Sequence, residues 1–163
     1  METARTKLTL LAREDFPDVM QMFNDPETTT YIKHLQYLSG AESETILNNR
    51  LTQVENKTGY HWTARLKSTN DFIGALNLSP IPNTEMMQIG FQLATKYWNR
   101  GFASELAKKV LEFGIHEAGL KIIYGVFEKE NVGSRKVLER LGFSVDKKSA
   151  LEEKGVEVYR FDE

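Results

Sequence analysis

Residues 88–104 combine the side chains and the spacing that suit the binding of an anion. They read QIGFQLATKYWNRGFAS, which predicts a strand, a glycine-containing loop and the first turn of a long helix. The first backbone amides of a helix have no partner within it and lie at the positive end of its dipole. Gly101 lets a ligand approach the backbone closely, and Arg100 adds a fixed positive charge. This stretch therefore predicts a phosphate-binding loop.

The two common phosphate loops do not fit, because the chain has neither G-x-x-x-x-G-K-[ST] nor G-x-G-x-x-G after a strand. The stretch instead resembles the acyl-CoA loop of the GNAT N-acetyltransferases, in the RimJ/RimL type, which often reads I-G-Y-W-L-x-x-x-Y-W-G-K-G-Y-A-T-E-A. This chain has IGFQL at 89–93 and YWNRGFASE at 97–105, with Asn99 where the first glycine is usual. Asparagine tolerates unusual backbone angles better than most residues. The resemblance implies that the residues binding acetyl-CoA include Phe91, Gln92, Leu93, Asn99, Arg100, Gly101, Phe102, Ala103 and Ser104.

A second motif, ENVGSRKVLERLGF at 130–143, resembles the same family over a whole helix. Asn131 is well placed as its N-cap. In the family the matching asparagine contacts the pantetheine arm, and the matching serine is proposed to protonate the leaving thiolate. The resemblance thus implies that Asn131 binds acetyl-CoA and that Ser134 both binds it and is catalytic. The residues alone leave open that Asn131 only caps the helix and Ser134 only fills its first turn.

Two positions depart from the usual pattern of the family. Leu138 stands where many other GNAT enzymes carry a tyrosine acid, and Gln88 stands where many relatives carry an acidic residue. A glutamine cannot usefully accept a proton, so Glu85, Glu27 and His34 are the alternative bases, although such carboxylates are more often solvated surface groups. Four basic residues either meet the adenosine 3′-phosphate or only favour solubility: Lys108, Lys109, Arg135 and Lys136.

Composition limits the class of protein. The chain has 163 residues, of which 40% are hydrophobic and 27% charged, which predicts one globular domain over residues 1–163. The net charge of −2 gives no support for nucleic-acid binding. No apolar run reaches the ~20 residues that span a bilayer, and the N-terminus has no secretory pattern, so we expect a cytoplasmic protein.

The chain contains no cysteine. This excludes disulfides, thiolate zinc sites and a cysteine acyl-enzyme, so an acetyl group would pass directly to the acceptor unless another nucleophile intervened. No cluster of His, Asp or Glu has the spacing of metal ligands. We therefore expect no metal, and the resemblance implies acetyl-CoA as co-substrate.

The hydrophobic pattern predicts alternating strands and helices. Strands are expected at 7–12, 60–67, 72–78, 85–93, 121–127, 143–146 and 156–161, the last two joined by a turn at 153–155. Helices are expected at about 16–23, 28–38, 41–55, 102–119 and 131–141. The resemblance implies an α/β (α+β) GNAT fold, with a mixed, mostly antiparallel sheet of about seven strands, a splayed parallel pair in its middle, and four to five flanking helices.

The implied reaction transfers an acetyl group from acetyl-CoA to a primary amine in a ternary complex, with the strand amides of Phe91 to Leu93 as donors to the oxyanion. A protein or peptide N-terminus is the first acceptor to expect, because an α-amino group (pKa ~8) needs less help from a base than lysine (~10.4). A small amine such as a polyamine or an antibiotic is the second. A non-catalytic acyl-CoA-binding module is the third reading, raised by Gln88 and Leu138. The sequence is compatible with a monomer or a homodimer.

Overall fold

The computed structural model describes residues 1–147 and 155–163, and it contains one mixed sheet of seven strands in the order β1-β2-β3-β4-β5-β7-β6. All neighbouring strands are antiparallel except β4 and β5. The strands are β1 (Thr6–Leu10), β2 (Tyr60–Leu66), β3 (Phe72–Pro80), β4 (Met87–Leu93), β5 (Ile122–Glu128), β6 (Ser144–Val145) and β7 (Val156–Asp162).

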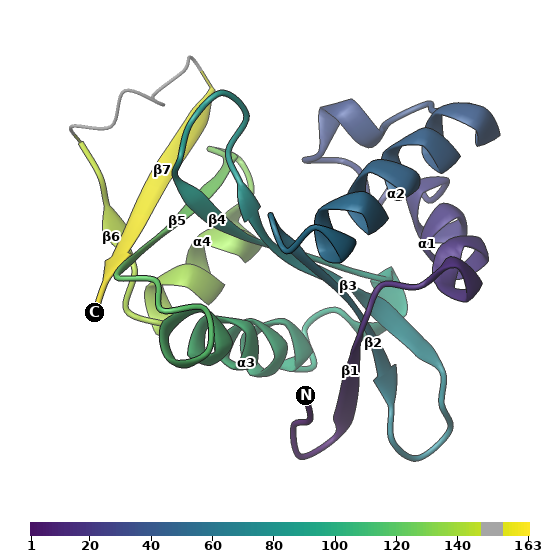
Figure 1. The fold of residues 1–163 in the computed structure, drawn as a ribbon, viewed down its shortest axis with the longest axis horizontal. Helices are drawn as coiled ribbons and strands as arrows, with labels where there is room; N and C mark the ends of the chain where they lie inside the picture. The colour runs from purple at the N-terminus through teal and green to yellow at the C-terminus, as the bar shows by residue number, and fades with distance from the viewer. Residues whose placement is uncertain (148–154) are drawn as a thin grey trace.

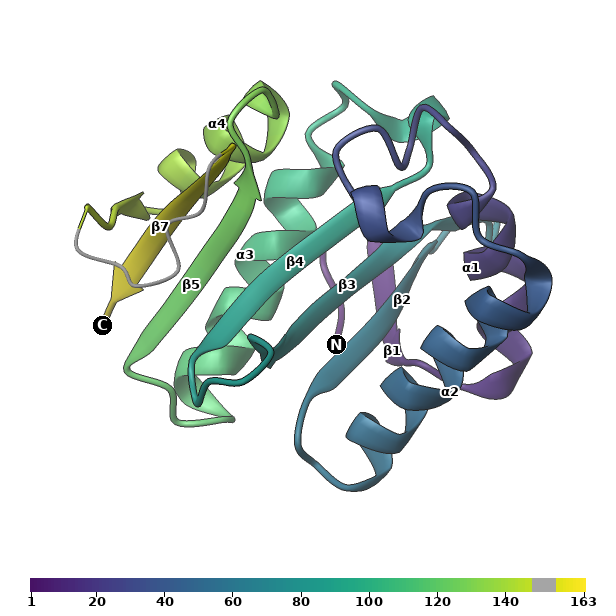
Figure 2. The same cartoon turned by 90° about the horizontal axis from the view of Figure 1, so that it is seen from above.

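Four α-helices cover the two faces of this sheet in the described residues. They are α1 (Phe16–Phe23), α2 (Gly40–Glu55), α3 (Phe102–His116) and α4 (Val132–Arg140). The helices α1 and α2 lie on one face, and α3 and α4 lie on the other (Figures 1 and 2). Short 3₁₀ turns occur at η1 (Arg13–Asp15), η2 (Lys33–Leu35) and η3 (Thr95–Tyr97). The expected fold is confirmed.

Local signals explain where the helices begin. Ser39 caps α2: its hydroxyl accepts the Glu42 amide, and the Glu42 carboxylate accepts the Ser39 amide at 2.8 Å. Asn131 caps α4 by accepting the Ser134 amide at 3.0 Å. On α3, buried side chains at Phe102, Leu106 and Val110 follow the helical period and pack into the main core. These caps and apolar stripes fix the helices against the sheet.

The parallel pair in the middle of the sheet diverges. The strands β3 and β4 pair at seven positions, from Gly74 with Leu93 to Pro80 with Met87. In contrast, β4 pairs with β5 only at Gln88 and Tyr124. The C-terminal half of β4 therefore has a neighbour on one side only, as expected for a splayed pair, and Figure 2 shows both strands from above.

The helix predicted at 28–38 is wrong. Turns and the short η2 occupy this segment, and Tyr37 has a left-handed backbone with φ of 59°. Asp25 accepts the hydroxyl of Thr28, while the hydroxyls of Thr29 and Thr30 donate to the carbonyls four residues earlier. Such local side-chain bonds compete with a helical ladder, and the three threonines are β-branched.

One helix boundary also differs from the prediction, and one predicted turn is not tested. The helix α3 ends at His116 rather than at Gly119, which adopts a left-handed conformation (φ 67°) beyond the helix end. The predicted turn at 153–155 lies mostly outside the described residues. Within the described residues, no helix has both the length and the apolar character needed to cross a membrane.

Candidate functional site

A cavity of about 560 Å³ opens where the end of β4, the following loop, the start of α3 and the first turn of α4 meet. Segment 28–32 closes one side of it. Ten of the eleven residues that the sequence marks as binding or catalytic line this cavity: Phe91, Gln92, Leu93, Asn99, Gly101, Phe102, Ala103, Ser104, Asn131 and Ser134. Two motifs about thirty residues apart in sequence thus share one wall.

The loop between β4 and α3 leaves its amides free. Asn99 and Gly101 both have left-handed backbones, with φ of 57° and 79°, so the asparagine at the usual glycine position preserves the turn. Within the described chain, no backbone amide of residues 99–104 donates a hydrogen bond to protein, and the first α3 amide to do so is that of Glu105, to the Gly101 carbonyl. Unpaired amides at the N-terminus of a fifteen-residue helix form a site of positive potential.

Arg100 is the one predicted binding residue that does not line the cavity. Its guanidinium lies over the rings of Tyr97 and Phe102, at 5.7 and 5.5 Å from their centroids. Its carbonyl accepts a hydrogen bond from Arg5 Nη1 at 3.1 Å. Arg5 in turn pairs with Glu105 at 2.7 Å. The N-terminal segment therefore anchors the outside of the loop.

Backbone amides of β4 face the gap beside β5. Ala94 donates to the Ile73 carbonyl at 2.9 Å, and bonding groups alternate along an antiparallel strand. The amides of Phe91 and Leu93 therefore point away from β3, toward the side on which β5 has diverged. The carbonyl of Leu93 faces the same way, and it accepts the indole N–H of Trp98 at 2.7 Å. This part of the gap offers donors, and the acceptor at its end is already satisfied.

The first turn of α4 presents Ser134 to the cavity. Its amide is held by Asn131, while its hydroxyl makes no hydrogen bond within the described residues. Leu138 is buried against β5, where a Cβ on Gly125 would lie 2.5 Å from the Leu138 Cδ1 atom. Leu138 therefore belongs to the core and does not line the cavity. Ser134 thus brings a free hydroxyl to this wall, and the Ser104 hydroxyl at the start of α3 likewise makes no hydrogen bond among the described residues.

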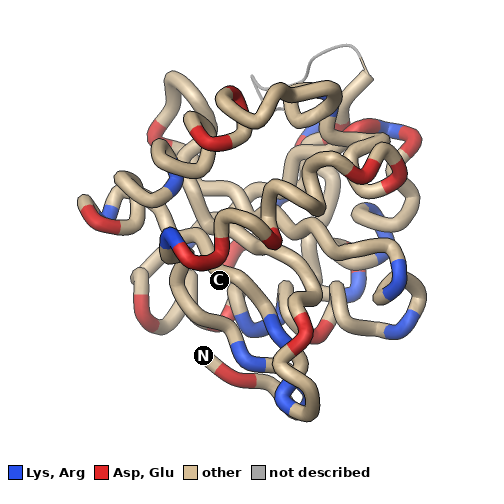
Figure 3. Tube along the Cα trace, turned by 90° about the vertical axis from the view of Figure 1, so that its right-hand side faces the viewer, with Lys and Arg blue, Asp and Glu red and all other residues tan. Residues whose placement is uncertain are grey.

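The predicted basic residues divide into two groups. Lys136 lines the cavity, and so does Arg140, which the sequence analysis missed. Arg135 is held by Glu157 at 3.0 Å, and Lys109 is paired with Glu112 at 3.2 Å. Lys108 is exposed and lies outside the cavity lining. Lysines and arginines are scattered with acidic residues over a trace that is mostly uncharged (Figure 3).

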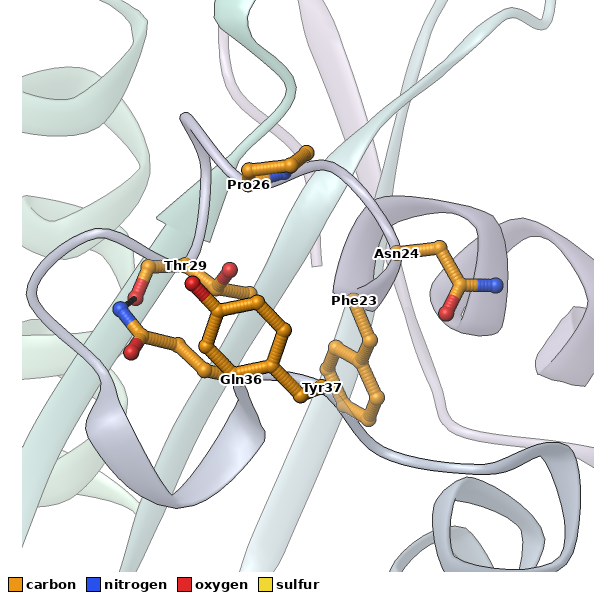
Figure 4. Close-up of a pocket in the computed structure, with 6 residues that line it drawn as sticks. All are labelled: Phe23, Asn24, Pro26, Thr29, Gln36 and Tyr37. Carbon is orange, nitrogen blue, oxygen red and sulfur yellow. Dashed lines mark hydrogen bonds between the residues drawn. The ribbon is translucent and has the colours of Figure 1, made fainter.

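A smaller pocket of about 110 Å³ lies on the other side of segment 28–32 (Figure 4). Its walls come from the end of α1 and the segment after it: Phe23, Asn24, Pro26, Thr29, Gln36 and Tyr37. The Gln36 amide donates to the carbonyls of Thr29 and Thr30 at 2.9 and 3.0 Å, which holds the segment in its turns. Thr29 lines this pocket while Thr28 lines the large cavity.

No carboxylate candidate for the base lies at the gap. Gln88 pairs with Ser79 and Tyr124 inside the sheet, and Glu27 and Glu85 are exposed and line neither pocket. Burial and the charge of Arg50 lower the pKa of His34, so its imidazole is neutral at neutral pH. In the described chain, no group of three His, Cys, Asp or Glu side chains could hold a metal ion.

Sequence reasoning missed the cavity residues that precede α2 and the indole donor. Thr28, Tyr31 and Ile32 line the cavity from a segment that was assigned to a helix. Trp98 matched the family motif at 97–105, but nothing in the motif indicated that its N–H satisfies the Leu93 carbonyl. The signal available was chemical: a tryptophan beside a strand end has one donor and needs an acceptor.

Comparison with known proteins gives matches that span most of the chain. Residues 5–144 match the family described as acetyltransferase (GNAT) domain. The uncharacterized protein YkkB of Bacillus subtilis (strain 168) is 29% identical over 143 residues, which cover 85% of this chain and 80% of YkkB.

Three solved structures share the fold. An acetyltransferase from Agrobacterium tumefaciens str. C58 superposes with a TM-score of 0.88 at 21% identity, covering 100% of this chain and 94% of that one. RimL, a ribosomal L7/L12 alpha-N-protein acetyltransferase in complex with coenzyme A, gives 0.80 at 16% identity, with coverages of 98% and 95%. The spermidine N-acetyltransferase from Vibrio cholerae, in complex with CoA and spermine, gives 0.76 at 19% identity, with coverages of 95% and 92%.

Proposed function

Because this chain belongs to the GNAT acetyltransferase family and is an acetyl-CoA-dependent N-acetyltransferase, we propose that it acetylates the N-terminal α-amino group of a protein or peptide. The proposed location of the active site rests on one observation. A single cavity gathers the unpaired amides of the α3 N-terminus, the gap-facing amides of β4 and the free hydroxyl of Ser134. These are the groups that an acetyl thioester and its reacting carbonyl require.

The residues present fit acetyl-CoA. Residues 99–104 offer free amides at the positive end of α3, and such a concentration of donors suits a pyrophosphate. Asn131 and Ser134 line the same cavity, where they would contact the pantetheine arm. Lys136 and Arg140 supply positive charge at its rim for a further phosphate. Acetyl-CoA supplies the activated acetyl thioester.

The chain's own groups then act on the two charges that the reaction creates. The amides of Phe91 and Leu93 stabilise negative charge on the reacting carbonyl oxygen. The amine nitrogen forms the new N–C bond, the C–S bond breaks, and Ser134 donates its hydroxyl proton to the departing sulfur. Ser134 recovers a proton from the amine through solvent, because nitrogen loses one proton as its bond forms.

An α-amino acceptor is consistent with a site in which none of the predicted carboxylate bases lies at the gap. Since α-amino groups have a pKa near ~8, an appreciable fraction is neutral at pH 7. No carboxylate is therefore required at Gln88. The alternative acceptor is a small amine such as a polyamine, and a fold shared with both RimL and a spermidine N-acetyltransferase is compatible with either class.

An acceptor screen tests the proposal. Purified protein is given acetyl-CoA and, separately, peptides with free N-termini, polyamines and aminoglycosides, and the release of free thiol is followed. We expect release that depends on the added amine and is fastest with peptides. Thiol release with polyamines alone would show that polyamines, and not peptides, are the acceptors. An absence of thiol release with every amine would overturn the proposed reaction.

A further inference from the structure

Arg50 lies on α2 with its guanidinium 5.2 Å from the centroid of the Phe23 ring. It is half-buried, yet within the described residues it makes no hydrogen bond and no ion pair. The guanidinium of Arg65, which is similarly half-buried, is paired with Asp15 and Asp18, at 3.1 Å from the Asp15 carboxylate. Arg50 is therefore a half-buried cation that lacks an anionic partner among the described residues.

A half-buried cation without an anion beside it is costly, because it gives up part of its hydration without gaining an ion pair. Burial lowers the pKa of the Arg50 guanidinium to about 10, which leaves it charged at neutral pH. The imidazoles nearest to it give no compensation, since burial and the charge of Arg50 lower the pKa of both His34 and His61. Five N–H donors in a planar fork are thus held without an acceptor.

Arg50 lies on the face of the sheet that also carries Gln92, beside a residue of the smaller pocket. Phe23 packs in one core cluster with Ala75, and Ala75 pairs across the sheet with Gln92. Gln92 lines the large cavity, and its Nε2 atom is buried without a partner among the described residues. Phe23 lines the smaller pocket of Figure 4. Arg50 itself lines neither hollow, but its guanidinium lies against Phe23, a wall residue of the smaller one, on the α1–α2 face of the sheet.

We propose that Arg50 binds a carboxylate carried by the acceptor amine, with the Gln92 amide as a second donor toward the acceptor. This rests on the proposed acetyl transfer and narrows its substrate class. A guanidinium binds a carboxylate through two parallel hydrogen bonds, which also orients the molecule that carries it. The acceptor is an amine with a nearby carboxylate, from either a free amino acid or a peptide with an acidic first residue. The positive charge of Arg50 disfavours polycationic acceptors such as polyamines.

Matched acceptor pairs test this class and separate its two sources. Glycine is compared with glycinamide, and the C-terminally amidated peptide Asp-Ala-Ala with Asn-Ala-Ala, by kcat/KM for thiol release from acetyl-CoA. We expect the carboxylate member of at least one pair to be preferred by about tenfold or more. Preference in the first pair indicates a free amino acid, and preference in the second an acidic N-terminus. Equal rates within both pairs, or spermidine as the best acceptor, would overturn the proposal.

Variants identify the residue responsible. Arg50→Met keeps the length and apolar contact of the side chain and should remove the preference, while rates with the amide acceptors change less than twofold. Arg13→Met is the matched control, since Arg13 lies over the ring of Phe16 on the same helix pair but is exposed, and it should leave the preference intact. Equal loss with all acceptors in Arg50→Met would indicate a structural role and contradict carboxylate binding.

The anion site can be tested even if no amine releases thiol. Binding of N-acetylaspartate, a product of the proposed class, is then measured by calorimetry on wild type and on Arg50→Met. Weaker binding by the variant supports the anion site although the reaction proposed for the chain has failed. Identical isotherms, or no binding to wild type, would overturn the role of Arg50.

Discussion

The proposed coenzyme side, which is the β4–α3 loop with the start of α4, and the proposed acceptor side, which is segment 24–38 with α2, are built in different ways. On the coenzyme side, β4, α3 and α4 present backbone amides from regular elements, together with the hydroxyls of Ser104 and Ser134. On the acceptor side, segment 24–38 is held in turns by bonds between its own side chains and backbone. The titratable groups there are the side chains of Arg50, which is charged, and of His34 and His61, which are neutral at neutral pH.

This difference determines which contacts of each side survive a substitution. A helix N-terminus keeps its free amides with almost any side chains, provided that the turn before it can form. Here Asn99 in place of glycine preserves that turn. The acceptor side has no such protection, because each of its contacts depends on one particular side chain. We therefore expect substitutions on the two sides to separate coenzyme binding from acceptor choice.

Ser134→Ala is the strongest test of the coenzyme side. The Asn131 cap bonds to the amide of residue 134, so it survives the substitution. Loss of a general acid typically costs about a hundredfold or more, and we expect kcat to fall by that factor while the Kd for CoA rises less than threefold. Thiol release and calorimetry measure the two quantities.

Asn131→Ala is the matched control for Ser134. It removes the cap, which should destabilise the fold by ~1 kcal/mol, and it should weaken CoA binding more than it lowers kcat. If Ser134→Ala instead lowers CoA affinity and turnover by the same factor, the hydroxyl only binds, and the coenzyme side has no acid of its own.

The pH dependence of stability tests the acceptor side. Burial and the charge of Arg50 lower the pKa of His61 to about 3, so the folded state keeps it neutral while the unfolded chain takes up a proton below ~6.5. The unfolded state then binds more protons, and stability falls as the pH drops from ~6.5 toward about 3. At about pH 5 the loss from this one group is ~2 kcal/mol.

Denaturant unfolding of wild type and His61→Gln at about pH 7 and about pH 5 measures that loss. The glutamine variant should lose less stability between the two values, by about the ~2 kcal/mol assigned to His61. Equal losses of unfolding free energy in both proteins would mean that the folded state does not hold His61 neutral. The surroundings of His61 would then be solvated.

The sequence predicted the local structure of the β4–α3 loop and of the α4 cap well, and that of segment 28–38 poorly. The anion loop and the Asn131 cap follow from local rules: a helix leaves its first amides free, and asparagine bonds the third amide after it. The turns at 28–38 were missed because apolar spacing favoured a helix, while the bonds of Asp25 and the threonines opposed one. Arg50 lacks an anionic partner because of the tertiary packing around α2. A local sequence pattern cannot predict this.

Gly101→Ala tests whether the loop conformation serves binding, with Gly119→Ala as its control. Both glycines have positive φ, 79° and 67°, and they lie beyond opposite ends of α3. Alanine should cost either position ~1 kcal/mol of stability. Only Gly101 lines the cavity, so only its variant should also lose CoA affinity, by about tenfold. Equal CoA affinity in the two variants would remove the anion loop from the coenzyme side.

Trp98→Phe has the smallest expected effect and tests where the two sides meet. The indole N–H satisfies the Leu93 carbonyl at the open end of the gap. Phenylalanine retains the ring and removes that donor, which leaves a carbonyl dipole close to the oxygen that the Phe91 and Leu93 amides are proposed to stabilise. One lost hydrogen bond is worth ~1 kcal/mol, so kcat should fall about fivefold with little change in CoA affinity. Trp62→Phe, in the core beside Tyr60 and Phe113, should lower the unfolding free energy without this kinetic signature. If Trp98→Phe leaves kcat unchanged, the gap-facing amides act independently of the carbonyl beside them, and the splay of β4 from β5 alone is enough to expose them.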